Sequence, residues 1–227
     1  MKTRHAATEP GPVFRIGLAL LLFAITAGLA LALLAEPVAP GVAGQVEAAL
    51  GDSGAKNHVT AVLLNFRGYD TLLELAVLTS ALVGVWALGV APDIKETTPS
   101  PVLLGMNSVL IPLAPLFCAY LLWAGASRPG GAFQAGAVLA AAAVLYNISC
   151  RRPELRLPSA PLRPGIVIGL GVFIATGFGV MGGGRAFMEY PAGLAGGLIL
   201  LIETAATLSI ALILASLFVG GRPEGEP

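Results

Sequence analysis

Long blocks of apolar residues constrain the fold of this chain more than any other feature of its sequence. Each block holds about 20 residues, the length at which an α-helix crosses the hydrocarbon core of a bilayer. Only 11% of the residues are charged, less than half of the roughly 25% that is typical of a soluble domain. We therefore predict an all-α, polytopic integral membrane protein with about six transmembrane helices in the lipid bilayer. The predicted spans are 13–35, 71–91, 102–124, 132–150, 165–181 and 192–219.

Lysine and arginine residues predict the orientation of these spans, because cytoplasmic loops of membrane proteins are enriched in them. The first block is too long for the apolar core of a secretory signal, which runs about 7–15 residues, so we expect it to remain as a span. With a cytoplasmic N-terminus, nine of the 13 basic residues fall on the cytoplasmic side, and the loop 151–156 carries most of this asymmetry. We predict a multi-pass protein of the prokaryotic cell membrane with both termini in the cytoplasm.

The linker 92–101 contains three prolines among charged and hydroxyl residues and is the best internal boundary. It separates a two-span module, 1–100, from a four-span module, 101–227. Within the first module, the segment 36–56 is typical of an external connection, with a short surface helix over 42–50. The apolar segment 59–64 is too short to cross a bilayer by itself. It is either an interfacial helix or the outer end of a broken second span.

Glu74 is the first candidate for ion transport. It lies about one turn inside the second predicted span, after Arg67 and Asp70. A charged side chain at the bilayer centre costs about 2.5–3.5 kcal/mol on insertion scales, so it is retained mainly where it faces a protein interior or an ion path. One interpretation is therefore a proton relay through Glu74. The other is an interfacial carboxylate satisfied by Arg67 or by amides at the helix N-terminus.

Glu203 is the second intramembrane carboxylate, and apolar residues precede it for two turns of the last span. No Lys or Arg lies near it in the sequence, so its partner must come from another helix or from a neighbouring protein. A carboxyl group that titrates at this depth is suited to proton transfer. The alternative is a protonated structural Glu that is hydrogen-bonded across a pair of helices.

The segment Pro129-Gly130-Gly131 opens the fourth span. A proline and two glycines are suited to a sharp turn into a helix N-terminus, whose amides bind an anion or a carboxylate. The simpler interpretation is a tight structural loop between two spans.

Several classes of function find no support in the sequence. The formal net charge is zero, so nothing points to a nucleic-acid partner. Cys118 and Cys150 lie at different depths of the predicted bilayer, which argues against a disulfide, because bridged Cα atoms lie within about 7 Å of each other. No Cys/His cluster indicates a metal or another cofactor. No nucleophile or phosphate-binding motif indicates an enzyme.

Two stretches of the chain together resemble subunits of Mrp-type multisubunit cation/proton antiporters and of membrane-bound hydrogenases. The segment FRGYDTLLE at 66–74 is similar to the FRGFDTxxE segment of the large antiporter subunit and of the hydrogenase E-type subunit. The region that begins at 107–108 and contains PGGAFQ at 129–134 resembles the antiporter B subunit, whose mark is GHxxPGGGF followed by an acidic residue in the last span. The chain departs from the family pattern at Asn65, Ala126, Ala132 and Ala135.

The resemblance implies an all-helical subunit of a larger membrane complex. It implies translocation of ions, Na⁺ and H⁺, with Glu74 as the main functional residue and Glu203 near the acidic position of the last span. Three settings remain open: an antiporter driven by the proton motive force, a redox-driven ion pump of the hydrogenase type, and a structural subunit without a direct transport role.

Overall fold

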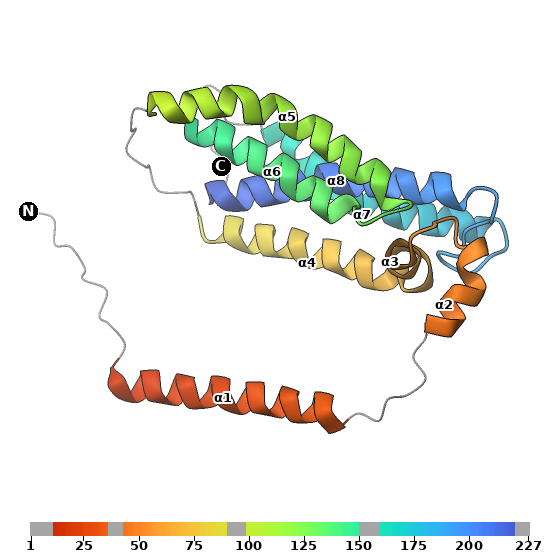
Figure 1. Ribbon diagram of the computed structural model, residues 1–227, viewed down its shortest axis with the longest axis horizontal. Coiled ribbons are helices and arrows are strands. Elements are labelled where there is room, and N and C mark those ends of the chain that lie inside the picture. The colour runs from red at the N-terminus through yellow and green to blue at the C-terminus, as the bar shows by residue number, and fades with distance from the viewer. Residues whose placement is uncertain (1–10, 36–42, 90–98, 150–158, 221–227) are drawn as a thin grey trace, which may run out of the picture. The chain divides into compact units, whose positions relative to one another are not determined.

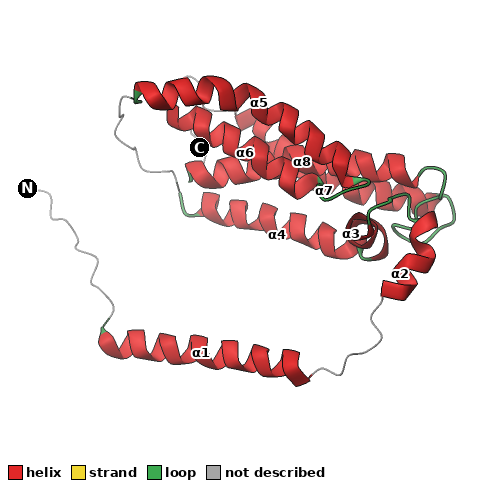
Figure 2. Ribbon diagram, viewed as in Figure 1, coloured by secondary structure: helices red, strands yellow, loops and turns green. Residues whose placement is uncertain are grey.

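The computed structural model of the chain describes residues 11–35, 43–89, 99–149 and 159–220. Figure 2 shows that all regular secondary structure in these ranges is helical, with no β-strand among them. Six of the helices in these ranges are long and apolar enough to cross a membrane. The predicted all-α, multi-pass membrane fold is therefore confirmed.

The first unit of the chain, residues 1–43, contains helix α1, Pro12–Ala35. Large apolar side chains such as Leu20, Phe23 and Leu31 are exposed along this helix. A helix that is apolar on all sides is suited to a lipid environment. Helix α1 matches the first predicted span and begins one residue earlier.

The second unit, residues 44–227, contains a bundle of long helices (Figure 1). Helix α8 is its most buried member: 56% of its most apolar stretch is buried, against at most 28% for the other candidate spans among the described residues. It packs against α6, α7 and α4, while α5 packs mainly against α6. The bundle helices are α4 (Gly68–Ala87), α5 (Pro101–Gly125), α6 (Ala132–Ser149), α7 (Ser159–Gly182) and α8 (Ala195–Val219).

Helices α4 and α7 differ from the predicted spans by several residues, for local reasons. Helix α4 begins three residues before the predicted start because the helical path is interrupted at Arg67, where φ is −128° and ψ is 37°. It ends at Ala87, four residues early, and the chain then reaches Gly89 at φ 111°, which a side chain would disfavour. Helix α7 begins six residues early and has Pro161 in its first turn, where a missing amide hydrogen costs little.

The segment that precedes α4 consists of short helical pieces. The expected surface helix over 42–50 is present as α2, Ala43–Ala49, followed by the 3₁₀ turn η1, Leu50–Asp52. Helix α3, His58–Ala61, continues into the π-helix η2, Val62–Phe66. The apolar segment 59–64 is thus helical, and the break at Arg67 separates it from α4.

Hydrogen bonds hold this segment against the loop between α5 and α6. The backbone amides of Lys56 and Asn57 donate to the carbonyl of Ala126 over 2.9 and 3.2 Å. The hydroxyl of Thr60 donates to the carbonyl of Gly125 over 2.6 Å, in a buried position. The start of α4 is therefore tied to the loop that leads into α6. Most of the predicted linker 92–101, the basic loop 151–156 and the tail from residue 221 lie outside the described residues.

Candidate functional site

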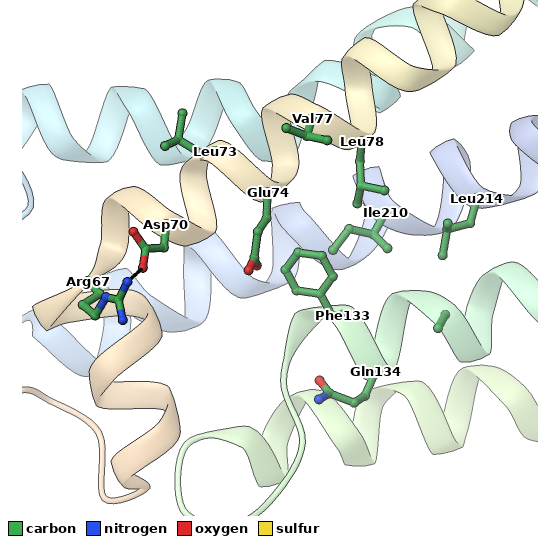
Figure 3. Close-up of a pocket in the computed structure, with 11 residues that line it drawn as sticks. Arg67, Asp70, Leu73, Glu74, Val77, Leu78, Phe133, Gln134, Ile210 and Leu214 are labelled. Carbon is green, nitrogen blue, oxygen red and sulfur yellow. Dashed lines mark ion pairs between the residues drawn. The ribbon is translucent and has the colours of Figure 1, made fainter. Parts of the chain in front are cut away.

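A pocket of about 900 Å³ opens between α4, α6 and α8 (Figure 3). Its polar residues lie toward the end of the bundle where α4 and α6 begin, and its other walls are apolar. The pocket brings residues of the 66–74 segment together with residues of the 129–134 segment, which are far apart in the sequence. Its lining consists of Arg67, Asp70, Leu73, Glu74, Val77, Leu78, Phe133, Gln134, Ala137, Ile210 and Leu214.

Arg67 and Asp70 form an ion pair at the break before α4, with 2.5 Å between Nη2 and Oδ2. Both side chains are well exposed, so solvent screening limits such a pair to about 0–1 kcal/mol. Asp70 lies in the first turn of α4, where a negative charge also interacts favourably with the helix dipole. The partner of Arg67 in this structure is therefore Asp70.

Glu74 lies one turn further along α4 and is exposed to the pocket. Figure 3 shows its carboxylate extending toward the first turn of α6, on the side of Phe133. No ion pair or hydrogen bond to it is found within the described ranges. Within this chain, Glu74 is thus an accessible carboxylate on a membrane-spanning helix, and Arg67 does not neutralise it.

Glu203 is buried, with 3% of its surface exposed. Its carboxylate is hydrogen-bonded by the backbone amide of Ala132, the first residue of α6. The partner that sequence reasoning required from another helix is therefore a helix N-terminus, where amide groups and the helix dipole favour a negative charge.

The loop 129–131 is a tight turn, and its geometry depends on both glycines. The amide of Gly131 donates to the carbonyl of Leu121 over 3.0 Å. A Cβ atom on Gly130 would lie 2.4 Å from the same oxygen. Gly131 has φ 111°, and a Cβ atom there would lie 3.0 Å from Oε1 of Glu203. Pro129 is exposed at the start of the turn. The sequence left two interpretations of this loop, a tight turn and an amide that binds a carboxylate. The structure contains both features.

Gln134 is a polar residue of the site that sequence reasoning did not single out. It is exposed, lines the pocket with Glu74, and lies two residues after Ala132, whose amide binds Glu203. Its Oε1 would lie 3.6 Å from a Cβ atom on Gly131. The signal in the sequence was its place in the first turn of the fourth span, but only the packing of α4 against α8 brings Glu74 to the same pocket.

The loop between α7 and α8 braces the start of α4. Met188 has φ 66°, an uncommon value for a residue other than glycine, and it is 4% exposed. Its sulfur would lie 2.8 Å from a Cβ atom on Gly68, so the absence of a side chain at Gly68 makes room for it. The adjacent Phe187 packs against Tyr69, with ring centroids 5.4 Å apart. These contacts fix the turn that presents Arg67 and Asp70.

Among the described residues, no group of three or more His, Cys, Asp or Glu side chains is arranged to hold a metal ion. Cys118 is buried and free, and Cys150 lies outside the described residues. The polar atoms of the pocket are carboxylate, guanidinium and amide groups. The carboxylates can hold and release protons or bind monovalent cations, whereas the guanidinium stays charged and acts only as a hydrogen-bond donor.

Comparison with protein families gives two matches on successive parts of the chain. The family described as "Domain related to MnhB subunit of Na+/H+ antiporter" matches residues 102–221, which is more than half of the chain. The family described as the E subunit of MBH matches residues 14–91.

The chain is also similar to individual proteins and solved structures. The chain is 30% identical over 207 aligned residues to a probable K⁺/H⁺ antiporter A/B subunit of Rhizobium meliloti (strain 1021), in a match that takes in 75% of this chain but only 20% of that protein. It matches a chain of an archaeal respiratory membrane complex, the membrane-bound sulfane sulfur reductase, with a TM-score of 0.73, 26% identity and coverage of 91% of this chain and 97% of that one. A chain of the Mrp complex from Dietzia sp. DQ12-45-1b has the same fold, with a TM-score of 0.68, 20% identity and coverage of 96% and 27%.

Proposed function

Because the chain belongs to the family of domains related to the MnhB subunit of Na⁺/H⁺ antiporters, with a domain of the MBH E-subunit family before it, we propose that it is a membrane subunit of a multisubunit cation/proton antiporter. We propose Na⁺ as the cation, because the matched family is named after a Na⁺/H⁺ antiporter. K⁺ is the cation to compare with it, because the Rhizobium meliloti relative is a probable K⁺/H⁺ antiporter. The chain spans a fifth of the length of that relative, so separate subunits would have to supply the rest of such a complex. We propose these subunits as its partners.

The single observation that carries this proposal is the carboxylate of Glu74, which has no partner among the described residues and borders a pocket beside a helix long and apolar enough to span the membrane. A carboxylate that faces lipid would be costly, whereas one that faces an ion path is useful. Glu74 accepts a proton or a cation that reaches the pocket and releases it again as the complex turns over. Its exposed position in the isolated chain also fits a surface that a neighbouring subunit covers.

Arg67 and Asp70 form the approach to Glu74 in this proposal. Their ion pair lies at the break before α4, about one turn from Glu74, and keeps polar groups at the mouth of the pocket. A cation entering the pocket meets Asp70 before it meets Glu74. The Arg67 guanidinium balances the charge of Asp70, so the mouth of the pocket does not hold cations too tightly.

The two family matches also support two modules within the chain, 1–100 and 101–227, with the boundary in the linker. Residues from both modules line the pocket, since Glu74 comes from the first and Gln134 from the second. Because the two modules form one polypeptide, the residues on both sides of the pocket are covalently linked.

The proposal is tested by measuring exchange with and without this chain. Everted membrane vesicles that contain the complete complex should show dye-monitored proton efflux on addition of Na⁺, and vesicles from cells that lack only this chain should not. The purified chain alone in proteoliposomes should not exchange, because a complete proton path needs more ionisable groups than the two intramembrane carboxylates found here. Full exchange without the chain would refute a transport role and favour a purely structural subunit.

A second function is favoured by one specific observation. The archaeal respiratory complex contains a chain that this one covers almost entirely, at 26% identity. In that setting the protein would belong to a redox-driven ion pump. The two functions differ in what drives transport: an antiporter exchanges ions under an imposed pH gradient alone, whereas a redox pump transports only when an electron donor and acceptor are supplied.

We also propose that the chain lies in the prokaryotic cell membrane, because its relatives include a protein of Rhizobium meliloti and an archaeal complex, and that both termini are cytoplasmic, on the basis of its Lys and Arg distribution. Single cysteines introduced at 151–156 should then be labelled by an impermeant thiol reagent only from the cytoplasmic side. Cysteines introduced within α2 should be labelled from outside, in a background in which Cys118 and Cys150 are replaced by alanine. The opposite pattern would reverse the orientation.

A further inference from the structure

The buried carboxylate of Glu203 has no role in the function described above, although it lies close to the pocket. Along α8 its neighbours Ile199, Ile202 and Ala206 are almost fully buried. The amide of Ala132 provides its hydrogen bond. The hydrogen bond from that amide stabilises the ionised carboxylate, and the apolar neighbours favour the neutral carboxylic acid. The site can therefore hold the side chain in either protonation state.

Gly131 leaves open the space between this carboxylate and the pocket. A Cβ atom at this position would lie 3.0 Å from Oε1 of Glu203 and 3.6 Å from Oε1 of Gln134. The two polar side chains therefore border the same small space. Gln134 in turn lines the pocket that contains Glu74. Glu74 and Gln134 thus both border the pocket, and Glu203 lies in the interior beside Gly131.

We propose that Glu203 is a second proton-holding site, supplied from Glu74 through a water molecule that Gln134 positions beside Gly131. This inference rests on the proposed function, because it extends the path that begins at Glu74. A glutamine amide both donates and accepts hydrogen bonds, so it orients a water molecule for transfer without itself taking up the proton.

The transfer conserves charge and protons. The neutral carboxylic acid of Glu74 gives its proton to the water, the water passes a proton to the ionised carboxylate of Glu203, and Glu74 returns to its ionised form. When Glu203 becomes neutral, its hydrogen bond with the amide of Ala132 weakens, because a charge-assisted bond is replaced by a neutral one. The first turn of α6, which carries Phe133 and Gln134 into the pocket, is thereby loosened each time a proton arrives.

The experiment compares four variants of the complete complex in everted vesicles, with exchange expressed per assembled complex. Glu203→Gln keeps the shape and the hydrogen-bond acceptor but cannot take up a proton, and Gln134→Leu removes the amide from an exposed position. Glu203→Gln should lower exchange by about 100-fold or more, as expected for a lost proton-transfer group, and Gln134→Leu should lower it less, because it removes only the group that orients the water. Glu203→Asp and Gln134→Asn should each restore part of the activity. The controls are Asp52→Asn and Gln45→Leu, which make the corresponding changes at exposed positions outside the pocket, and both should exchange normally.

The outcomes separate this inference from the proposed function. Normal exchange in Glu203→Gln, together with loss in Glu74→Gln, would overturn the second proton site and leave the antiporter role intact. Normal exchange in both would overturn both. If Glu203→Gln fails to assemble, the result for Gln134→Leu decides, because normal exchange in that variant overturns the path.

Discussion

Replacement of Glu74 by glutamine is expected to lower cation/proton exchange by the assembled complex by about 100-fold or more, without loss of assembly. Glutamine keeps the shape of the side chain but cannot bind and release a proton. Because no residue in the described ranges pairs with Glu74, no ion pair within them is broken by this change. The measurement is dye-monitored proton exchange in everted vesicles, with immunodetection of the complex in the same membranes.

Glu74→Asp should retain part of the exchange, since the carboxyl group remains but moves by one methylene. The matched control is Asp52→Asn, in which an exposed carboxylate of η1 outside the pocket is likewise replaced by its amide, and which should exchange normally. Normal exchange in Glu74→Gln would show that Glu74 has no role in transport. The interpretation as a structural subunit would then be favoured.

Replacement of Gly130 by alanine is expected to destabilise the turn between α5 and α6 by about 1–3 kcal/mol or more. The new Cβ atom would lie 2.4 Å from the carbonyl oxygen of Leu121 and 3.0 Å from the amide nitrogen of Gly125. These are backbone atoms, so the turn itself must shift and the hydrogen bond from Gly131 to Leu121 is lost. Thermal unfolding of the purified chain in detergent should occur at a lower temperature, and less complex should accumulate in the membrane.

The matched control for this variant is Gly105→Ala in α5, where a Cβ atom meets no other atom within 4 Å. This substitution should leave stability unchanged or raise it, because alanine favours helix more than glycine does. Equal stability of the Gly130→Ala and Gly105→Ala variants would show that the turn accommodates a side chain, against the geometry described here.

The sequence indicated some of the candidate residues of the site but not others. Glu74 and Glu203 stood out because a carboxylate is rare within an apolar block, and that signal needs no knowledge of packing. Gln134 did not stand out, because a single amide near a helix start is common. Their functional roles remain proposals, but their positions show that Glu74 belongs to a pocket and Glu203 to the interior beside it.

The break in the helix at Arg67 is another feature that the sequence indicated only in part. The segment 59–64 was expected to be helical, either at the interface or as the end of a broken span, and it forms α3 and η2. Where the helix stops depends on long-range contacts. Thr60 bonds to Gly125, and Met188 occupies the space that Gly68 leaves free. Such contacts lie far apart in the sequence, so local pattern does not indicate them.

The sequence by itself determined that this protein is a bundle of apolar helices and where most of its spans lie, because the length and hydropathy needed to cross a bilayer are local properties of the chain. It also determined which ionisable residues lie within those spans. Only the tertiary structure decided their partners. The packing of α8 between α4 and α6 directs Glu203 to the amide of Ala132, and it brings Glu74 and Gln134 to one pocket. The physical reason is that buried polar groups must find partners in three dimensions, and helices far apart in the sequence supply them.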